Sequence, residues 1–248
     1  MKKIKNDVLK NAVFGSVNTF EENGFLKMRR FTDKQLEHFI ETENYIHKFK
    51  KGKASSGINI DFYTDATLMK IRLNCYVASS QTPCFVDVYV DGIMKEHFGY
   101  NAKEAGIIEK EIEFDNGEKR VTLWFPCLFE TQITEFLLDG EMFKPVEKEK
   151  KILFFGDSIT QGYTSEFPSL TYTNIVTREL NAESVNQGIG AALFDATDLD
   201  EELPFSPEMV FVAYGTNDWA HSGERDFSSN AKTYIKKSAG FIPMQKNM

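Results

Sequence analysis

The chain has 248 residues, of which 42% are hydrophobic and 27% are charged, and its formal net charge is −8. This length allows one large domain or two small ones, and the composition is that of an ordinary soluble globular protein. Because the net charge is negative, we expect no nucleic-acid partner. No apolar run approaches transmembrane length and the basic N-terminus lacks the apolar segment of a signal peptide, so we expect no membrane association.

The three cysteines, Cys75, Cys84 and Cys127, are odd in number and lack the spacing of metal ligands. We therefore expect reduced core residues of a cytoplasmic protein, with no metal site and no cofactor. The 22 phenylalanines are most simply core residues, although aromatic side chains can also form a platform for sugars.

The first 56 residues show short, mixed patterns. Strands are predicted at 12–14 and 25–28, and Thr32 is a predicted N-cap for a short helix over 33–40. The basic run 48–53 is typical of a solvated loop.

Residues 57–139 alternate between apolar and polar side chains, as strands with one buried face do. Asp91-Gly92 and Asn116-Gly117 are typical of hairpin turns. Together these signals predict an antiparallel β-sandwich. The predicted strands cover residues 58–62, 69–75, 85–90, 111–114, 121–125 and 133–138.

The charged run 146–151 separates this pattern from the next one. We place a domain boundary there, with a β-sandwich domain over 1–148 and a second domain over 149–248. In the second domain strands alternate with helices predicted near 170–180, 195–202 and 226–237. This order favours a parallel sheet with crossover helices.

The second domain begins with a strand of four successive apolar residues at 152–155, which leads directly into Gly156-Asp157-Ser158. A short buried strand that ends in a tight turn presents Ser158 rigidly. If a helix begins there, the backbone N–H groups near the serine favour developing negative charge. The alternative is an ordinary strand-to-helix turn in which Ser158 is the N-cap.

Residues 156–160, Gly-Asp-Ser-Ile-Thr, resemble the first block of the GDSL, or SGNH, hydrolase family. Residues 186–191 resemble its second block, and residues 215–218, which follow an apolar run, resemble its third block with its asparagine. We refer to these as the first, second and third motifs. The resemblance covers residues 151 to about 237 and implies a flavodoxin-like parallel α/β domain. Residues 1–148 resemble more loosely the jelly-roll-like β-sandwich that precedes some esterases of this family.

The resemblance implies serine chemistry on an ester. Ser158 would attack the ester carbonyl, and its own N–H, the N–H of Gly190 or Ala191 and the Asn217 side-chain amide would hold the oxyanion. Asp157 and Asp218, which flank these groups, are candidate substrate-binding residues. Ala191 stands where the family has glycine, a mild departure if the φ angle of Ala191 is negative.

A serine nucleophile also needs a base, which the family supplies from an Asp-x-x-His block near its C-terminus. No histidine follows His221 in this sequence, and residues 238–248 are too few for the missing strands and helices. We therefore expect an incomplete hydrolase domain that lacks its last third. Asp218 and His221 have the right spacing but overlap the third motif, so His221 is only a substitute candidate for the base.

The expected activity is hydrolysis of small acyl esters, with acetylated carbohydrates as one candidate class, weakened by the missing base. Two alternatives stay open: acyl transfer by the same serine, and a carbohydrate-binding β-sandwich attached to a degenerate hydrolase remnant. In the latter case Tyr89, Tyr100 or Trp124 would stack on sugars, although core packing is the simpler role for them. The apolar run 209–214 would form an open sheet edge, so we expect the chain either to form a homodimer through that strand or to be poorly stable.

Overall fold

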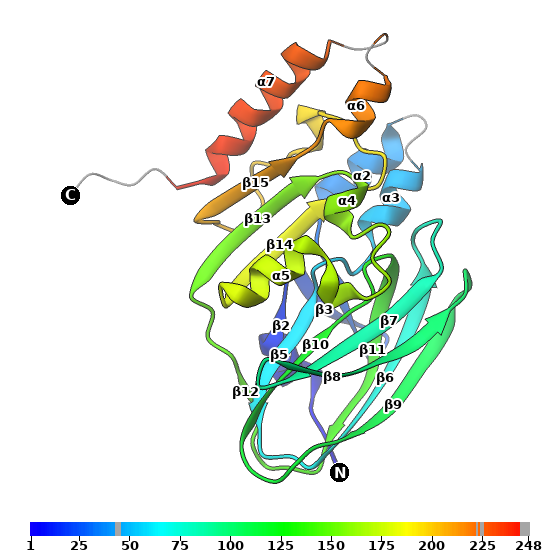
Figure 1. Cartoon of the computed structure of the whole chain (residues 1–248), viewed down its shortest axis with the longest axis vertical. Coiled ribbons are helices and arrows are strands. Elements are labelled where there is room, and N and C mark those ends of the chain that lie inside the picture. The colour runs from blue at the N-terminus through cyan, green and yellow to red at the C-terminus, as the bar shows by residue number, and fades with distance from the viewer. Residues whose placement is uncertain (43–45, 222, 224–225, 244–248) are drawn as a thin grey trace, which may run out of the picture.

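The computed structural model of the chain describes residues 1–42, 46–221, 223 and 226–243 (Figure 1). These residues form two antiparallel sheets and one parallel sheet, with helices gathered mainly around the parallel sheet. The mixed α/β and antiparallel architecture expected from the sequence is confirmed. No helix within the described ranges is long and apolar enough to cross a membrane.

The first antiparallel sheet consists of β1 (Lys2–Lys3), β3 (Asn18–Glu22), β4 (Phe25–Arg29), β6 (Leu68–Val77), β9 (Gly106–Glu113) and β11 (Phe129–Leu138). Its order is β3-β4-β11-β6-β9, and β1 pairs with β11. The second consists of β2 (Val13–Phe14), β5 (Asn59–Thr64), β7 (Pro83–Val90), β8 (Ile93–Asn101), β10 (Lys119–Trp124) and β12 (Lys144–Pro145). Its order is β12-β5-β10-β7-β8, and β2 pairs with β5.

One hydrophobic core lies between these two sheets. Ile71 and Leu73 of the first sheet and Val88 and Leu123 of the second are fully buried in the same cluster. Such one-sided burial is the reason for the alternating pattern of residues 57–139. Cys75, Cys84 and Cys127 are buried and unpaired, as predicted.

Two turn predictions have different outcomes. Asp91-Gly92 joins β7 to β8 as a hairpin, and both residues have positive φ angles. The hairpin predicted at Asn116-Gly117 is wrong, because β9 pairs with β6 whereas β10 pairs with β5 and β7. That turn carries the chain from one sheet to the other.

The parallel sheet consists of β13 (Lys150–Gly156), β14 (Ala182–Gly188) and β15 (Met209–Ala213), with β13 in the centre. Ile152 and Phe154 pack toward α5 (Tyr172–Glu179), and Leu153 and Phe155 pack toward α7 (Phe227–Ser238). Both faces are therefore buried, which explains the unbroken apolar run. Within the described residues β15 pairs only with β13, and pairing of its other edge with a second copy stays a prediction.

Short helical segments complete the chain. The helix predicted over 195–202 is only the short η3, whereas those near 170–180 and 226–237 are confirmed as α5 and α7. The remaining segments are α1 (Asn6–Leu9), η1 (Lys10–Ala12), α4 (Ser158–Gln161), η2 (Pro168–Leu170), η3 (Ala196–Asp198), α6 (Thr216–Ala220) and η4 (Ala239–Phe241).

Helices α2 (Asp33–Glu41) and α3 (Ile46–Gly52) belong to the N-terminal half but lie with the parallel sheet (Figure 1). Thr32 caps α2 in a capping box with Gln35, as predicted for the N-cap. The solvated loop predicted at 48–53 is wrong, because most of this run is helical and Lys48 is buried in an ion pair with Asp198.

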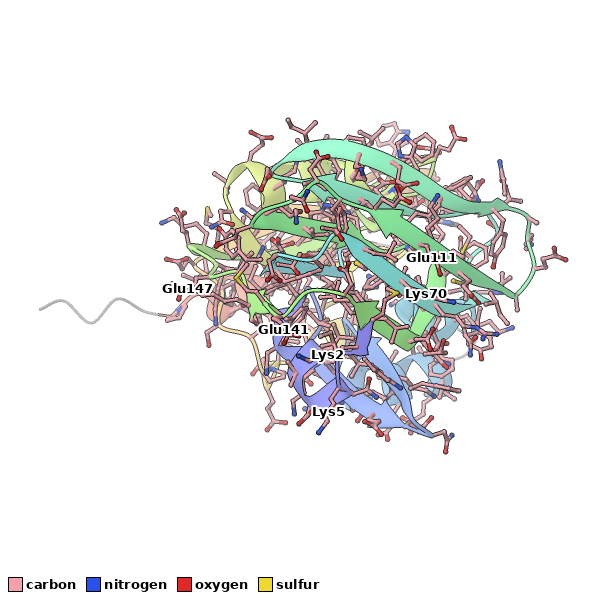
Figure 2. The ribbon with its side chains drawn as sticks, turned by 90° about the horizontal axis from the view of Figure 1, so that it is seen from below. Lys2, Lys5, Lys70, Glu111, Glu141 and Glu147 are labelled. Atoms are coloured by element: carbon pink, nitrogen blue, oxygen red, sulfur yellow. The ribbon has the colours of Figure 1, made fainter. Side chains whose placement is uncertain are left out.

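The end of the antiparallel sheets that is farthest from α6 carries exposed charges. Figure 2 shows this end, where the ammonium of Lys2 lies 2.7 Å from the carboxylate of Glu141, and that of Lys70 lies 3.9 Å from Glu111. Exposed pairs of this kind contribute about 0–1 kcal/mol. These two ion pairs therefore add little stability.

Candidate active site

The carboxyl ends of the three parallel strands bring the three motifs together. Gly156 at the end of β13 is in register with Gly188 on β14 and with Ala213 on β15. The chain leaves each strand directly into one motif, so Ser158, Ala191 and Asn217 are placed at the same edge. Ligands of parallel α/β sheets bind at this edge.

Ser158 is the first residue of α4, one position after the N-cap Asp157. The alternative in which Ser158 is the N-cap is wrong, because the Asp157 carboxylate accepts the Ile159 N–H at 3.0 Å. The Ser158 side chain is half-buried, and its hydroxyl makes no hydrogen bond within the described residues. The Ser158 hydroxyl therefore has no hydrogen bond to a described residue to break before it can react.

Close backbone packing fixes the position of α4. A Cβ atom on Gly156 would lie 2.0 Å from Thr160 Oγ1, and one on Gly188 would lie 2.6 Å from the Gln161 nitrogen. The Asn186 side chain donates to the Thr160 carbonyl at 2.7 Å and accepts the Gly188 N–H at 2.9 Å. The first and second motifs therefore hold each other in place.

The predicted oxyanion donors differ in their availability. The Gly190 N–H is engaged, because it donates to Gln161 Oε1 at 2.6 Å. The Ala191 N–H is not engaged by any described residue. Asn217 donates one amide hydrogen to the Ala192 carbonyl at 3.0 Å, and a side-chain amide has a second one.

From the sequence we expected a negative φ angle at Ala191 if alanine were to replace the family's glycine easily. This is wrong, because the φ angle of Ala191 is +67°. This is the left-handed region, which costs an alanine about 1 kcal/mol relative to glycine. Ala191 is exposed at this edge of the sheet, and the chain adopts this backbone conformation despite its cost.

Asp157 and Asp218 are buried, with 3% and 4% of their surface exposed. Asp218 accepts the Phe194 N–H at 3.1 Å, as Asp157 accepts that of Ile159. Both carboxylates therefore position loops around the site, and a direct contact with substrate stays a prediction for them. Burial raises the pKa of Asp157, the Ile159 hydrogen bond opposes the rise, and Asp218 adds to it.

We expect Asp157→Asn to raise the free energy of unfolding at neutral pH. Asparagine keeps the N-cap oxygen but removes a carboxylate whose ionisation is disfavoured by burial. Because the folded pKa is raised, the folded protein holds the proton more tightly than the unfolded chain does. The cost of ionisation is thus present at neutral pH and disappears as the pH falls through the raised pKa.

Urea unfolding at neutral pH and at about pH 4 measures this difference. The advantage of Asp157→Asn should be smaller at the acidic pH. Asp157→Ala is the matched control, since it removes both the charge and the cap and should lose about 1 kcal/mol relative to the asparagine variant. Equal stability of the two variants would show that the cap contributes nothing.

His221 is exposed at the end of α6, where its N–H caps the helix. It has side-chain or ring contacts of its own, but none with Ser158. No imidazole of the described residues is hydrogen-bonded to the Ser158 hydroxyl, so none of them is in place as its base. Residues 244–248 of the C-terminal segment lie outside the described residues.

A buried arginine that sequence reasoning did not single out supports the second motif. Arg30 is fully buried, and its guanidinium donates to the carbonyls of Asn186 and Gly188 at 2.7 Å each. It also donates to Ala54 at 2.8 Å and Lys51 at 2.7 Å. Burial lowers the pKa of Arg30 to about 9, so the side chain is still charged at neutral pH.

Helices α2 and α3 hold the same loop through further side chains. Gln35 donates to Gln187 Oε1 at 3.1 Å and to the Asp198 carbonyl at 2.9 Å. Lys51 donates to the Gly190 carbonyl at 2.7 Å. These contacts join residues more than 130 positions apart, so no local pattern could have revealed them.

A serine at the end of a central parallel strand, beside backbone and amide N–H groups, defines the class: an α/β protein with a candidate serine hydrolase site. Residues 154–237 match the model of the GDSL-like lipase/acylhydrolase family. The resemblance of the three motifs is thereby confirmed. No curated protein matches the chain in sequence.

Solved structures share the fold. The salicylyl-acyltransferase SsfX3 from a tetracycline biosynthetic pathway has a TM-score of 0.75 and 20% identity, over 91% of this chain and 65% of that one. A protein of Bacteroides ovatus named as a putative GDSL-like lipase has a TM-score of 0.67 and 18% identity, over 92% of this chain and 68% of that one. A family two carbohydrate esterase from Clostridium thermocellum, in complex with cellohexaose, has a TM-score of 0.59 and 22% identity, over 77% of this chain and 69% of that one. The chain spans about two thirds of the length of these structures.

Proposed function

We propose that the chain is a serine acylhydrolase of SGNH type that acts on small acyl esters, with acetylated carbohydrates as the leading class. The observation that carries this is the meeting of Ser158, Ala191 and Asn217 at one sheet edge. Carbohydrate esterases among the structures of the same fold support the choice of substrate class.

The reaction follows from the donors at that edge. The Ser158 oxygen forms a bond to the ester carbonyl carbon, and the carbonyl oxygen becomes an oxyanion. The Ser158 and Ala191 N–H groups and the second Asn217 amide hydrogen are the donors available to that oxyanion. The ester C–O bond then breaks, the departing oxygen takes up the proton that Ser158 gave to solvent and leaves as the alcohol, and water releases the acyl group from Ser158 as the acid.

This reaction also requires a base that removes the proton of the Ser158 hydroxyl. Since no described residue accepts a hydrogen bond from that hydroxyl, we propose that turnover by the 248-residue chain is weak. Serine hydrolases that lose a member of their triad keep some catalysis from the oxyanion donors and binding alone. The same residual catalysis is expected here.

Hydrolysis of p-nitrophenyl acetate tests the proposal. We expect slow release of p-nitrophenol that falls at least about tenfold in Ser158→Ala, because the attacking oxygen is lost. Thr160→Ser is a matched control on the same helix, since Thr160 is buried and bonded to Tyr172. If Ser158→Ala hydrolyses as fast as the parent chain, Ser158 is not the nucleophile.

Acyl transfer is a second candidate, favoured by the likeness to a salicylyl-acyltransferase. It uses the same acyl-serine, which an alcohol acceptor discharges in place of water. A carbohydrate-binding role through Tyr89 and Trp124 is disfavoured, because only 7% and 2% of their surfaces are exposed. We further propose that residues 1–148 form a β-sandwich domain of jelly-roll type, whose α2 and α3 support the second motif.

A further inference from the structure

A cavity of about 520 Å³ lies beside the second motif, between α3 and the loops that follow β6 and β8. His47, Lys50 and Lys51 line it from α3, and Lys103 lines it from the loop after β8. Ser79 and Ser80 contribute hydroxyl groups from the loop after β6. No acidic side chain of the described residues lines this cavity, which we call the lysine cavity.

The lysines of this cavity lack anionic partners. Lys50 and Lys103 are exposed and form no ion pair within the described residues. Lys51 is half-buried, and its ammonium donates one hydrogen bond, to the Gly190 carbonyl at 2.7 Å. Three lysines that converge on one hollow, in a chain of net charge −8, create a local positive potential.

Neutral donors accompany these charges. The Ser79 oxygen is buried, lines the cavity and has no hydrogen-bond partner among the residues described. Buried polar atoms are nearly always hydrogen-bonded, so we expect a ligand or a water molecule to bond to this hydroxyl. Ser80 is bonded to the Tyr163 hydroxyl, and hydrogen bonds from Ser80 and Gln81 lower the pKa of Tyr163, with smaller effects from Lys51 and Lys103.

The lysine cavity adjoins the candidate active site. Lys51 bonds the carbonyl of Gly190, the residue before the candidate oxyanion donor Ala191. The Gly190 N–H in turn bonds Gln161 on the same helix as Ser158. On the other side, the Tyr163 N–H donates to the Ser158 carbonyl at 2.8 Å. The cavity is therefore connected to the helix of Ser158 by two chains of hydrogen bonds, one through Lys51 and Gly190 and one through Ser80 and Tyr163.

We propose that the lysine cavity is an anion subsite, which binds a carboxylate carried by the ester that Ser158 attacks. This proposal rests on the proposed function, because it assigns the anion to an acyl-ester substrate. The carboxylate can belong to the acyl chain or to an acidic sugar. Lysine ammonium groups and serine hydroxyls are suitable donors for either one.

Binding of succinate to the full chain, measured by calorimetry at low ionic strength, tests the subsite without turnover. The double variant Lys50→Gln/Lys103→Gln should weaken binding about tenfold, since each exposed charge contributes about threefold. Lys10→Gln, which removes an exposed lysine on η1, is the matched control and should bind normally. Ser158→Ala should also bind normally.

Salt gives an independent measure. Raising the ionic strength from about 0.01 M to about 1 M shortens the screening length from about 30 Å to about 3 Å and should abolish most of the binding. Equal affinity of the parent chain and the double variant, or affinity that does not change with salt, would overturn the subsite.

Turnover then assigns the anion to the substrate. The parent chain should prefer mono-p-nitrophenyl succinate or an acetylated glucuronate over the corresponding neutral esters, and these two probes separate an acyl anion from a sugar anion. The double variant should lose that preference while it hydrolyses p-nitrophenyl acetate normally. Succinate binding without any Ser158-dependent hydrolysis would overturn the proposed function but retain the anion site. Hydrolysis with the same preference in both chains would overturn the subsite alone.

Discussion

Replacing Arg30 with methionine will lower the free energy of unfolding by about 4 kcal/mol, which for a chain of this length lowers Tm by about 12 °C. Arg30 is fully buried and donates to four backbone carbonyls. Methionine fills a similar volume but has no N–H group. The carbonyls of Ala54, Asn186 and Gly188 would then lose this donor, and each one left unsatisfied costs about 1–3 kcal/mol. The Lys51 carbonyl would still accept from the Ala54 N–H and the Gln161 side chain.

Arg29→Met is the matched control, because Arg29 is the preceding residue and its side chain is partly exposed to solvent. Its guanidinium pairs with the exposed Asp33 and lies 5.0 Å from the Phe20 ring centroid. We expect a loss below about 1 kcal/mol for this variant. Urea unfolding of the three chains measures both values, and similar losses for Arg29→Met and Arg30→Met would contradict the importance of the carbonyl contacts.

Local patterns were enough to predict most of the strands. The apolar run 152–155 predicted the central strand because burial on both faces requires such a sequence. Each of the three motifs follows a strand, and because parallel strands end together, the register of β13 with β14 and β15 puts the motifs at one edge.

Features set by distant contacts could not be predicted in this way. The run 48–53 was expected to be solvated, because no local signal indicates that Lys48 pairs with Asp198, which lies 150 positions away. Arg30 followed no motif, although its carbonyl contacts hold the second motif. Asn116-Gly117 showed the turn chemistry but could not show that the flanking strands join different sheets.

Adding imidazole will raise Ser158-dependent hydrolysis of p-nitrophenyl acetate about 100-fold, if the missing function at this site is proton removal. The Ser158 hydroxyl is half-buried and has no acceptor among the described residues, so it is open to a diffusing base. Only neutral imidazole can accept the proton. The rescue should therefore grow as the pH rises through the pKa of free imidazole, near neutral pH, where imidazole loses its charge.

Imidazole also attacks this ester directly, so the rate in Ser158→Ala with the same imidazole concentration must be subtracted. The variant His221→Ala tests whether any hydrolysis seen before imidazole is added depends on His221 as the base. If His221 is not the base, the variant and the parent chain will have the same slow rate and the same rescue. Rapid hydrolysis by the parent chain that is lost in His221→Ala, and then restored by imidazole, would show that His221 reaches Ser158 during the reaction, although it does not contact Ser158 in this structure.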